Sequence, residues 1–478
     1  MKSIHLAMNI QKPSVKPIGW IKSFLWLVIA TACFHAAYAS IRHPAAGLLI
    51  FGYALGLVRL ADQPTVRRAF YFGLVTGFFC YAPQLFFIWD LFGPAAIVLW
   101  LVLAFWIGLF TAIVCGCIRR WGKSKVWWLI PVVWTGIEYF RSELYYLKFS
   151  WLNIGYALPI QFSGVGTSRI GMYAAGFAVI GIAAAYPYRF VRRRTTFEWF
   201  LIFTILIIIL ATLFPADYRS APRSRLSIVG VQLEFPNENI LPMSLNHALA
   251  KNPDAQIFVL SEYTLEGPVP DSLKDWCREH SRFLVIGGEV LLGTTNFYDT
   301  AFVVGTNGDV VFQQVKCVPI QFFKDGLPAK EQKVWNSPWG KIGLCVCYDL
   351  SYTRVADGLV RQGAQLLIVP TMDVEAWGRH EHELHARVAP VRAAEYGIPI
   401  FRLASSGISQ AVTGDGKVIA QAPFPGSADI IGAELPLSSR GSLPLDRYLA
   451  PVCVGITAFV TVTLLFFAWS EKRAGPKS

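Results

Sequence analysis

The sequence predicts a bundle of about eight membrane-spanning helices joined to one α/β domain outside the membrane. Of its 478 residues, 54% are hydrophobic and only 15% are charged, and the mean hydropathy is +0.44. Soluble domains carry about 25% charged residues, so this composition excludes an ordinary soluble enzyme. Apolar runs near membrane-spanning length recur along the chain, whereas residues 217–446 contain shorter, strand-like runs. The two patterns indicate two kinds of domain.

The apolar runs predict the membrane spans. A helix needs about 20 apolar residues to cross the hydrocarbon core, and eight runs reach or approach this length, the second and fifth being short. They are residues 21–39, 45–60, 69–89, 95–118, 126–140, 170–188, 197–214 and 448–469. The first run has a basic prefix typical of a signal peptide, but no small-residue cleavage site follows it. We therefore expect an uncleaved span there.

Basic residues cluster in alternate connections between these runs. The clusters are Lys2, Lys12, Lys16 and Lys22; Arg59, Arg67 and Arg68; Arg119, Arg120, Lys123 and Lys125; Arg189, Arg192, Arg193 and Arg194; and Lys472, Arg473 and Lys477. The positive-inside rule places these segments, and both termini, in the cytoplasm. The same clusters account for much of the net charge of +12, so no nucleic-acid partner is predicted. We expect a seven-helix domain at 1–216, an outer domain at 217–446, and a final span and tail at 447–478.

The outer region reads as alternating strands and helices. Short apolar runs predict buried strands at 225–231, 255–260, 282–287, 298–304, 310–315, 341–346, 365–369 and 398–403. Helical stretches are expected at 240–251, 271–280, 353–362 and 380–396. This alternation predicts an α/β layer architecture.

Three polar residues follow predicted strands of this domain. Glu262, Lys316 and Cys347 each come at the end of an apolar run. A thiol is a poor nucleophile until a base removes its proton, and a carboxylate can be that base. A lysine ammonium can stabilise the oxyanion of a tetrahedral intermediate. Taken singly, each residue is more often structural or solvated, so only their combination indicates catalysis.

The order of Glu262, Lys316 and Cys347, with Cys-Tyr-Asp after a glycine-containing strand, resembles the nitrilase superfamily (carbon-nitrogen hydrolase fold). With the membrane spans added, nearly the whole chain resembles the bacterial apolipoprotein N-acyltransferases. The resemblance implies a four-layer αββα sandwich. It also implies that Glu262 is the general base, that Lys316 stabilises the oxyanion, and that Cys347 is the acylated nucleophile.

Local matches extend the resemblance to supporting residues. Arg141 and the segment Phe149-Ser-Trp-Leu, which contains Trp151, resemble an Arg and a Phe-Pro-Trp-Leu segment of the family, with Ser150 in place of the proline. The other residues that the resemblance assigns to substrate binding or support are Gln232, Tyr298, Tyr348, Asp349 and Asp325.

The chain also departs from the family pattern. Where the family continues from its lysine to a second active-site Glu, this chain reads Lys316-Cys-Val-Pro-Ile-Gln-Phe-Phe-Lys-Asp325. Either Asp325 or Gln321 could take that place. Asp349 replaces a family Glu after Cys-Tyr, and Thr371-Met-Asp-Val-Glu-Ala-Trp377 replaces Asn-Asp-Ala-Trp. The chain is therefore interpreted as a divergent member.

Three histidines, His380, His382 and His385, lie close together in the sequence but lack the i, i+4 pair of a zinc-protease helix. No metal site and no cofactor are predicted. The resemblance implies an acyltransferase of the bacterial inner membrane. It would move an acyl chain from a phospholipid, through a thioester on Cys347, to the α-amine of a diacylglyceryl lipoprotein. A membrane-tethered amidase and a non-catalytic scaffold for a glycosyltransferase are the alternatives, and the complete triad argues against the scaffold.

Overall fold

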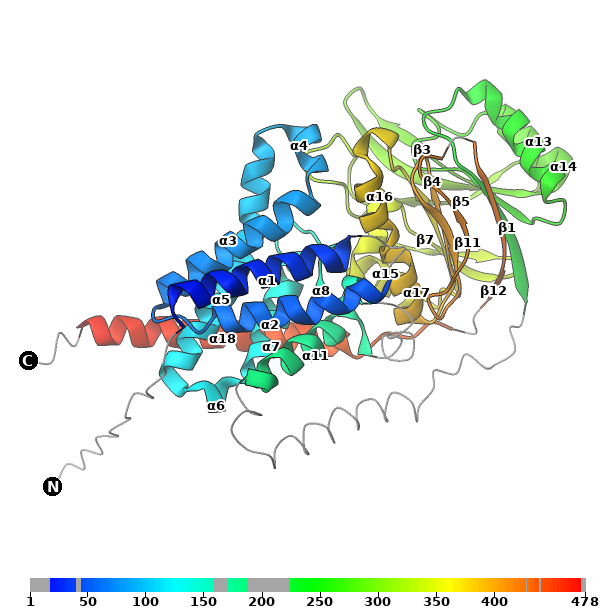
Figure 1. Ribbon diagram of the computed structural model, residues 1–478. Coiled ribbons are helices and arrows are strands. Elements are labelled where there is room, and N and C mark those ends of the chain that lie inside the picture. The colour runs from blue at the N-terminus through cyan, green and yellow to red at the C-terminus, as the bar shows by residue number, and fades with distance from the viewer. Residues whose placement is uncertain are drawn as a thin grey trace, which may run out of the picture.

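The computed structural model describes residues 18–39, 44–158, 170–187, 224–426, 428–437 and 440–473. The expected span at 197–214 and the basic cluster from Arg189 to Arg194 lie outside the described residues, as do Lys2, Lys12, Lys16 and Lys477. The described chain forms a helical bundle on one side and an α/β domain on the other (Figure 1).

The bundle contains helices at the other seven expected spans. Its helices are α1 (Trp20–Tyr38), α2 (Ile50–Leu60), α3 (Val66–Gln84), α4 (Phe87–Phe92), α5 (Ala95–Trp121), α6 (Lys123–Val126), α7 (Leu129–Tyr139), α8 (Ile154–Ala157), α11 (Met172–Ala185) and α18 (Asp446–Arg473). Among the described helices, α1, α5 and α18 are long and apolar enough to cross a membrane, while 45–60 and α11 are apolar but shorter.

Small residues let the bundle helices approach closely, as in other membrane helix pairs. A Cβ atom added at Gly73 of α3 would lie 2.1 Å from Thr111 Oγ1 of α5. A Cβ at Gly136 of α7 would lie 2.5 Å from the carbonyl oxygen of Cys453 on α18. These two glycines therefore fix the α3–α5 and α7–α18 contacts.

The α/β domain contains two six-stranded sheets. The first has the order β12-β1-β2-β3-β4-β5 and the second β11-β10-β9-β8-β7-β6. The strands are β1 (Arg225–Val231), β2 (Ile257–Val259), β3 (Phe283–Leu292), β4 (Asn296–Val304), β5 (Val310–Val315), β6 (Val334–Ser337), β7 (Gly340–Leu344), β8 (Leu366–Thr371), β9 (Ile400–Ala404), β10 (Ser409–Val412), β11 (Val418–Ala422) and β12 (Ile430–Pro436). β1, β2 and β3 are parallel, and so are β7, β8 and β9.

Alternating side chains of the first sheet pack on its two faces. Val229, Phe258 and Leu284 share a core with α13 (Leu241–Lys251) and α14 (Asp271–His280). Ile228 and Val285 belong instead to the core that includes the second sheet. With α15 (Thr353–Arg361), α16 (Arg379–Ala386) and α17 (Val388–Tyr396) packed beside the second sheet, the predicted αββα sandwich is confirmed (Figure 1).

The expected helix at 380–396 is wrong as a single element, because α16 ends at Ala386 and α17 begins at Val388. Pro390 lies in the first turn of α17, where its missing N–H costs no helical hydrogen bond. The break separates α16, which contacts α3 through the His380–Gln84 hydrogen bond, from α17. α16 can therefore face the bundle while α17 packs on the sheet (Figure 1).

Candidate active site

Glu262, Lys316 and Cys347 meet in the structure. Glu262 follows β2, Lys316 directly follows β5, and Cys347 opens a short 3-10 turn (Cys347–Ser351) after β7. Lys316 Nζ lies 2.7 Å from Glu262 Oε1. The backbone of Met372 links Glu262 to Cys347. Its N–H donates to Glu262 Oε2 at 2.7 Å, and its carbonyl accepts from Cys347 Sγ at 3.8 Å. All three side chains are buried.

The backbone at Cys347 has φ +49°, a conformation that non-glycine residues adopt only when their surroundings hold it. Asp349 supplies much of that support. Its carboxylate accepts hydrogen bonds from the backbone N–H groups of Cys317 at 3.0 Å, Val318 at 2.7 Å and Val346 at 3.3 Å. Asp349 therefore ties the turn of Cys347 to the chain that follows Lys316. The hydrogen bonds described for this carboxylate come from backbone N–H groups, and none comes from the side chains of Glu262, Lys316 or Cys347.

Two further carboxylates surround the lysine. Asp325 Oδ2 lies 2.8 Å and Asp299 Oδ2 3.4 Å from Lys316 Nζ. Asp325 also accepts from Tyr263 Oη at 2.8 Å and from the N–H of Ile320 at 2.6 Å. Of the two candidates for the missing second Glu, Asp325 contacts Lys316.

Gln321 is half-buried, and its side chain donates to the Tyr146 carbonyl at 3.4 Å. Asp299 is a site residue that the sequence did not predict. The sequence predicts its neighbour Tyr298 as a supporting residue instead. Tyr298 is half-buried, and because successive strand residues point to opposite faces, only Asp299 is directed at Lys316. The prediction of Tyr298 therefore lay one position away from the residue of β4 that contacts Lys316.

The charges of the site follow from burial and from Lys316. Burial alone would raise the pKa of Glu262, but the Lys316 ammonium lowers it below its ordinary value. Burial and the negative charge of Glu262 raise the pKa of Asp299 well above its ordinary value. Burial would lower the pKa of Lys316, but the surrounding carboxylates, Glu262 first, raise it well above its ordinary value. These pKa directions favour a charged Lys316, a charged Glu262 and a neutral Asp299.

The Cys347 thiol is protonated at rest. Burial raises the pKa of Cys347 well above its ordinary value, and the negative charge of Glu262 raises it further, while Lys316 opposes both. Burial also raises the pKa of Asp349 to about 6, although the N–H groups of Cys317 and Val318 favour its charged form. A nucleophilic Cys347 therefore requires a neighbouring base at the moment of reaction, and Glu262 has the charge and position to be that base.

Glu262, Asp299 and Asp325 bring oxygens within 4.8 Å of one another, as metal ligands can. The Lys316 ammonium contacts all three carboxylates, so it supplies the positive charge that this acidic group requires.

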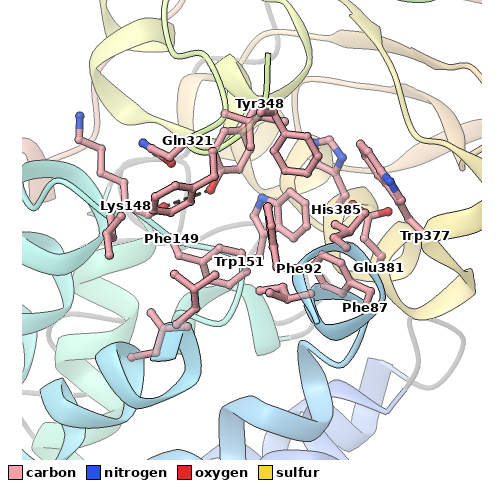
Figure 2. A pocket seen from close by; sticks show the side chains of 18 of the residues that line it. Phe87, Phe92, Lys148, Phe149, Trp151, Gln321, Tyr348, Trp377, Glu381 and His385 are labelled. Carbon is pink, nitrogen blue, oxygen red and sulfur yellow. Dashed lines mark hydrogen bonds between the residues drawn. The ribbon is translucent and has the colours of Figure 1, made fainter. Parts of the chain in front are cut away.

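A pocket of about 140 Å³ leads to Cys347 from the bundle side. Figure 2 shows its wall, to which Phe87 and Phe92 of α4, Phe149 and Trp151 of the loop after α7, and Tyr348 and Trp377 of the α/β domain contribute. The wall is almost entirely apolar, with Lys148, Gln321, Glu381 and His385 as its polar members. This pocket connects the membrane bundle to Cys347.

Trp151 lies at the centre of this wall. Its ring stacks on His385 with a centroid distance of 4.5 Å and an interplanar angle of 18°, and it meets Tyr348 edge-on at 5.7 Å. Arg141 supports the same loop, because its guanidinium donates to the Phe149 carbonyl at 3.1 Å and to Asn153 Oδ1 at 2.7 Å. Both residues are buried and act on the loop that closes the pocket.

Gln232 lies apart from the site. It follows β1, is buried, and donates through Nε2 to the Gly407 carbonyl at 2.5 Å. Its backbone pairs with Asp429 and Ala428. These contacts fix the loops at the end of β1, and none of the contacts described for Gln232 reaches Glu262, Lys316 or Cys347.

His380 faces the bundle, whereas His382 and His385 both lie near Asp373. His380 contacts Gln84 of α3 at 2.7 Å, His382 contacts Glu381 at 2.9 Å, and His385 contacts Asp373 at 2.8 Å. Asp373, Glu381 and His382 offer ligand atoms within 4.8 Å of one another. Arg402 also hydrogen-bonds Asp373, so a guanidinium already provides positive charge there.

Two protein families match the chain, one for each part of the structure. Residues 30–185 match the apolipoprotein N-acyltransferase N-terminal domain, and residues 235–444 match the carbon-nitrogen hydrolase domain. The first range covers most of the described bundle. The second covers most of the α/β domain, including Glu262, Lys316 and Cys347.

Individual proteins also match the chain, over different shares of its length. An apolipoprotein N-acyltransferase of Geobacter metallireducens is 23% identical over 96% of this chain and 93% of its own. A deaminated glutathione amidase of Dictyostelium discoideum is 27% identical over 33% of this chain, and the match spans 62% of the amidase. Among solved structures, an amidase from Nesterenkonia sp. aligns with a TM-score of 0.38 at 20% identity, over 44% of this chain and 90% of the amidase.

The match to the deaminated glutathione amidase covers a third of this chain, whereas the match to the Geobacter protein covers 96% of it and so includes both domains. With both domains present in the same order, the chain belongs to the apolipoprotein N-acyltransferase family, within the nitrilase (carbon-nitrogen hydrolase) superfamily.

Proposed function

We propose that this chain is an integral membrane N-acyltransferase with a Glu262–Lys316–Cys347 triad. It moves an acyl chain from a phospholipid to the α-amine of a diacylglyceryl-cysteine at the N-terminus of a lipoprotein. The observation that carries the proposal is the position of Cys347, which lies beside the Lys316–Glu262 pair and also lines an apolar pocket walled by bundle helices. The substrates come from the names of the relatives that match the whole chain or part of it.

The first half-reaction acylates the enzyme. Glu262 removes the proton of the Cys347 thiol, and the sulfur attacks the ester carbonyl of the phospholipid. Lys316 stabilises the negative oxygen of the tetrahedral intermediate, where electrostatic stabilisation contributes most. The intermediate collapses to a thioester when the glycerol oxygen leaves, and Glu262 returns the proton to that oxygen. The products are the acylated Cys347 and a lysophospholipid.

The second half-reaction discharges the thioester. The neutral α-amine of the lipoprotein attacks the acyl carbon, and Lys316 again stabilises the oxyanion. Glu262 accepts a proton from the attacking nitrogen and returns it to the departing Cys347 sulfur. An amide forms and the thiol is regenerated, so the cycle needs no metal or cofactor.

The pocket favours an acyl chain over a small polar substrate. Phe87 and Phe92 of α4 and Leu99 and Val102 of α5 form its bundle side, where a lipid tail can enter laterally. An apolar wall also keeps water from the thioester until the amine arrives. The exposed side chains of Phe322 and Phe323 project from the loop after Lys316, and the Phe323 ring lies 5.2 Å from that of Phe92. This loop thus forms the rim between the two domains.

The proposal includes the inner membrane as location, with the α/β domain on the outer face. The basic ends of α5 and α18, with Arg119, Arg120, Lys472 and Arg473, lie at the end of the bundle away from the α/β domain (Figure 1). The positive-inside rule assigns that end to the cytoplasm. Alkaline phosphatase fused after residue 216 should be active and fused after residue 194 inactive, and the reverse pattern would overturn this topology.

A second candidate is a membrane-tethered amidase that uses water as the acceptor, and the match of a third of the chain to a deaminated glutathione amidase favours it. Mass spectrometry of the protein in phospholipid micelles separates the two. A transferase accumulates acyl-Cys347 and discharges it onto a diacylglyceryl lipopeptide with a free α-amine, but barely onto the N-acetylated lipopeptide. Efficient cleavage of small amides without lipid would instead establish the amidase.

A further inference from the structure

A second cavity lies on the outer surface of the bundle, between α1 and α3. It has a volume of about 780 Å³ and is separate from the pocket at Cys347. Trp20 and Phe24 of α1 and Tyr71, Phe72 and Phe79 of α3 form its apolar walls. From residue 67 to residue 79 the groove follows α3 for roughly 18 Å, at 1.5 Å per residue. This length suits an extended lipid tail.

One end of the groove is basic. Arg67 and Arg68, in the first turn of α3, line it together with Thr65, and no Asp or Glu is among the described residues that line it. The Arg68 guanidinium lies 3.8 Å above the Trp20 ring and donates to Ser23 Oγ at 3.4 Å, which fixes its direction. Its buried Nε has no hydrogen-bond partner in the described part of the chain.

Three other basic residues at this end of the bundle have carboxylate partners. Arg59 and Lys123 both pair with Asp62, and Arg120 pairs with Glu471 at 3.2 Å. Within the described ranges, neither Arg67 nor Arg68 forms an ion pair with a carboxylate. Two adjacent uncompensated cations at the head of an apolar groove match the headgroup and tails of an anionic phospholipid.

We propose that the α1–α3 groove is a binding site for an anionic phospholipid. The headgroup phosphate contacts Arg67 and Arg68, and one acyl chain lies along Tyr71 and Phe79. The headgroup end of the groove is at the opposite end of α3 from α4 and the catalytic pocket (Figure 1). It is therefore distinct from the site of the acyl donor and does not rest on the proposed reaction.

Native mass spectrometry of the full-length protein tests this site. The protein is released from micelles that contain equal amounts of phosphatidylglycerol and phosphatidylcholine, and the retained lipids are counted. We expect wild-type protein to retain phosphatidylglycerol in preference to phosphatidylcholine. The double variant Arg67→Gln, Arg68→Gln should bind it roughly tenfold more weakly, because each basic residue near a lipid headgroup strengthens binding severalfold.

Arg120→Gln is the matched control, since it removes a basic charge from the same end of the bundle outside the groove. It should retain phosphatidylglycerol as wild type does. Phe79→Ser adds a test of the tail contact and should weaken binding while leaving the preference for the anionic headgroup. Equal retention of the two lipids by wild-type protein, or unchanged retention by the double variant, would overturn the proposal. The acylation of Cys347 is measured separately, so failure here leaves the proposed function standing.

Discussion

The indole Nε1 of Trp151 donates a hydrogen bond of 2.9 Å to the hydroxyl of Ser351, 200 positions further along the chain. Ser351 ends the turn that begins with Cys347. Tyr348, in the same turn, donates from its hydroxyl to the Lys148 carbonyl at 3.2 Å. The loop that follows α7 therefore helps to hold the turn of Cys347, so the bundle contributes to the framework of the candidate active site.

This relationship predicts how Trp151→Ala will behave. The substitution removes both the hydrogen bond to Ser351 and the ring that lines the pocket. Phospholipid acylation of Cys347 should slow by roughly a hundredfold, because small losses of alignment are costly in catalysis. Alkylation of Cys347 by a short water-soluble reagent should change much less. An equal effect on both reactions would show that Trp151 acts only on folding or on general access to the thiol.

The pKa of Glu262, held low by Lys316 against the effect of burial, predicts the acid limb of the pH profile. The base form is present above the lowered pKa, so single-turnover acylation should persist below the ordinary glutamate value of about 4.3 and fail only as the pH falls further. Because burial raises the pKa of Cys347, no rise in rate is expected near the ordinary thiol value of about 8.5. A rate that climbs through pH 8.5 would mean that the free thiolate, rather than the Glu262-activated thiol, is the reacting species.

Glu262→Gln removes the proposed base and keeps the size of the side chain. Formation of acyl-Cys347 should fall by about 10²- to 10⁴-fold, the usual contribution of a general base. Intact-protein mass spectrometry measures it directly. Normal acylation in the variant would move the base role to another residue.

A neutral substitution of Asp299 should preserve the acylation of Cys347, whereas a neutral substitution of Lys316 should abolish it. Asp299 is expected to be protonated because burial and Glu262 raise its pKa, so Asp299→Asn keeps its charge and shape and should retain acylation within a few-fold. Lys316→Met removes the oxyanion's partner and leaves Glu262 unpaired, so acylation should be lost. If Asp299→Asn abolishes acylation while the protein stays folded, a charged Asp299 is required.

A buried ion network joins the two domains and predicts a stability effect. Arg447, in the first turn of α18, contacts Asp357 of α15 at 2.9 Å and Glu395 of α17 at 3.3 Å, and its side chain is 5% exposed. Arg447→Met leaves Asp357 without its close buried cation, while Glu395 keeps its pair with Arg392 at 2.6 Å. The loss should cost about 3–5 kcal/mol of unfolding free energy. Thermal unfolding in detergent measures the loss.

The matched control is Arg225→Gln, which breaks an ion pair with Glu434 whose side chains are 67% and 64% exposed. It should leave the unfolding temperature nearly unchanged, because exposed pairs contribute little. Equal shifts in the two variants would contradict a stabilising role for the buried network.

The local sequence predicted the strands and helices whose own pattern of apolar and polar residues defines them. The strand Val310–Val315 and the helix Asp271–His280 have the predicted bounds. The sequence did not predict β6, β10, β11 and β12, since they are short or mixed in polarity, and β12 also depends on a distant partner. β12, for example, pairs with β1 about 200 residues earlier. Such strands are formed by tertiary pairing more than by propensity.

The site shows the same limit. Family resemblance placed Glu262, Lys316 and Cys347 together, but it left open whether Asp325 or Gln321 lies beside Lys316. Both lie in one loop, and only its fold directs Asp325 inward. Asp299 was missed because its inward direction depends on the register of β4 with β3 and β5. The sequence therefore predicts the chemistry better than it predicts the shape of the pocket.

The most direct test of the account is the mass of the protein after incubation with phospholipid micelles, followed by addition of a diacylglyceryl lipopeptide. We expect one acyl group on Cys347 that is lost to the lipopeptide amine, no adduct in Cys347→Ser, and normal acylation in Cys345→Ala, which alters a buried cysteine two residues away. An acyl group that never forms on Cys347, or that water removes as fast as the lipopeptide does, would contradict the acyltransferase.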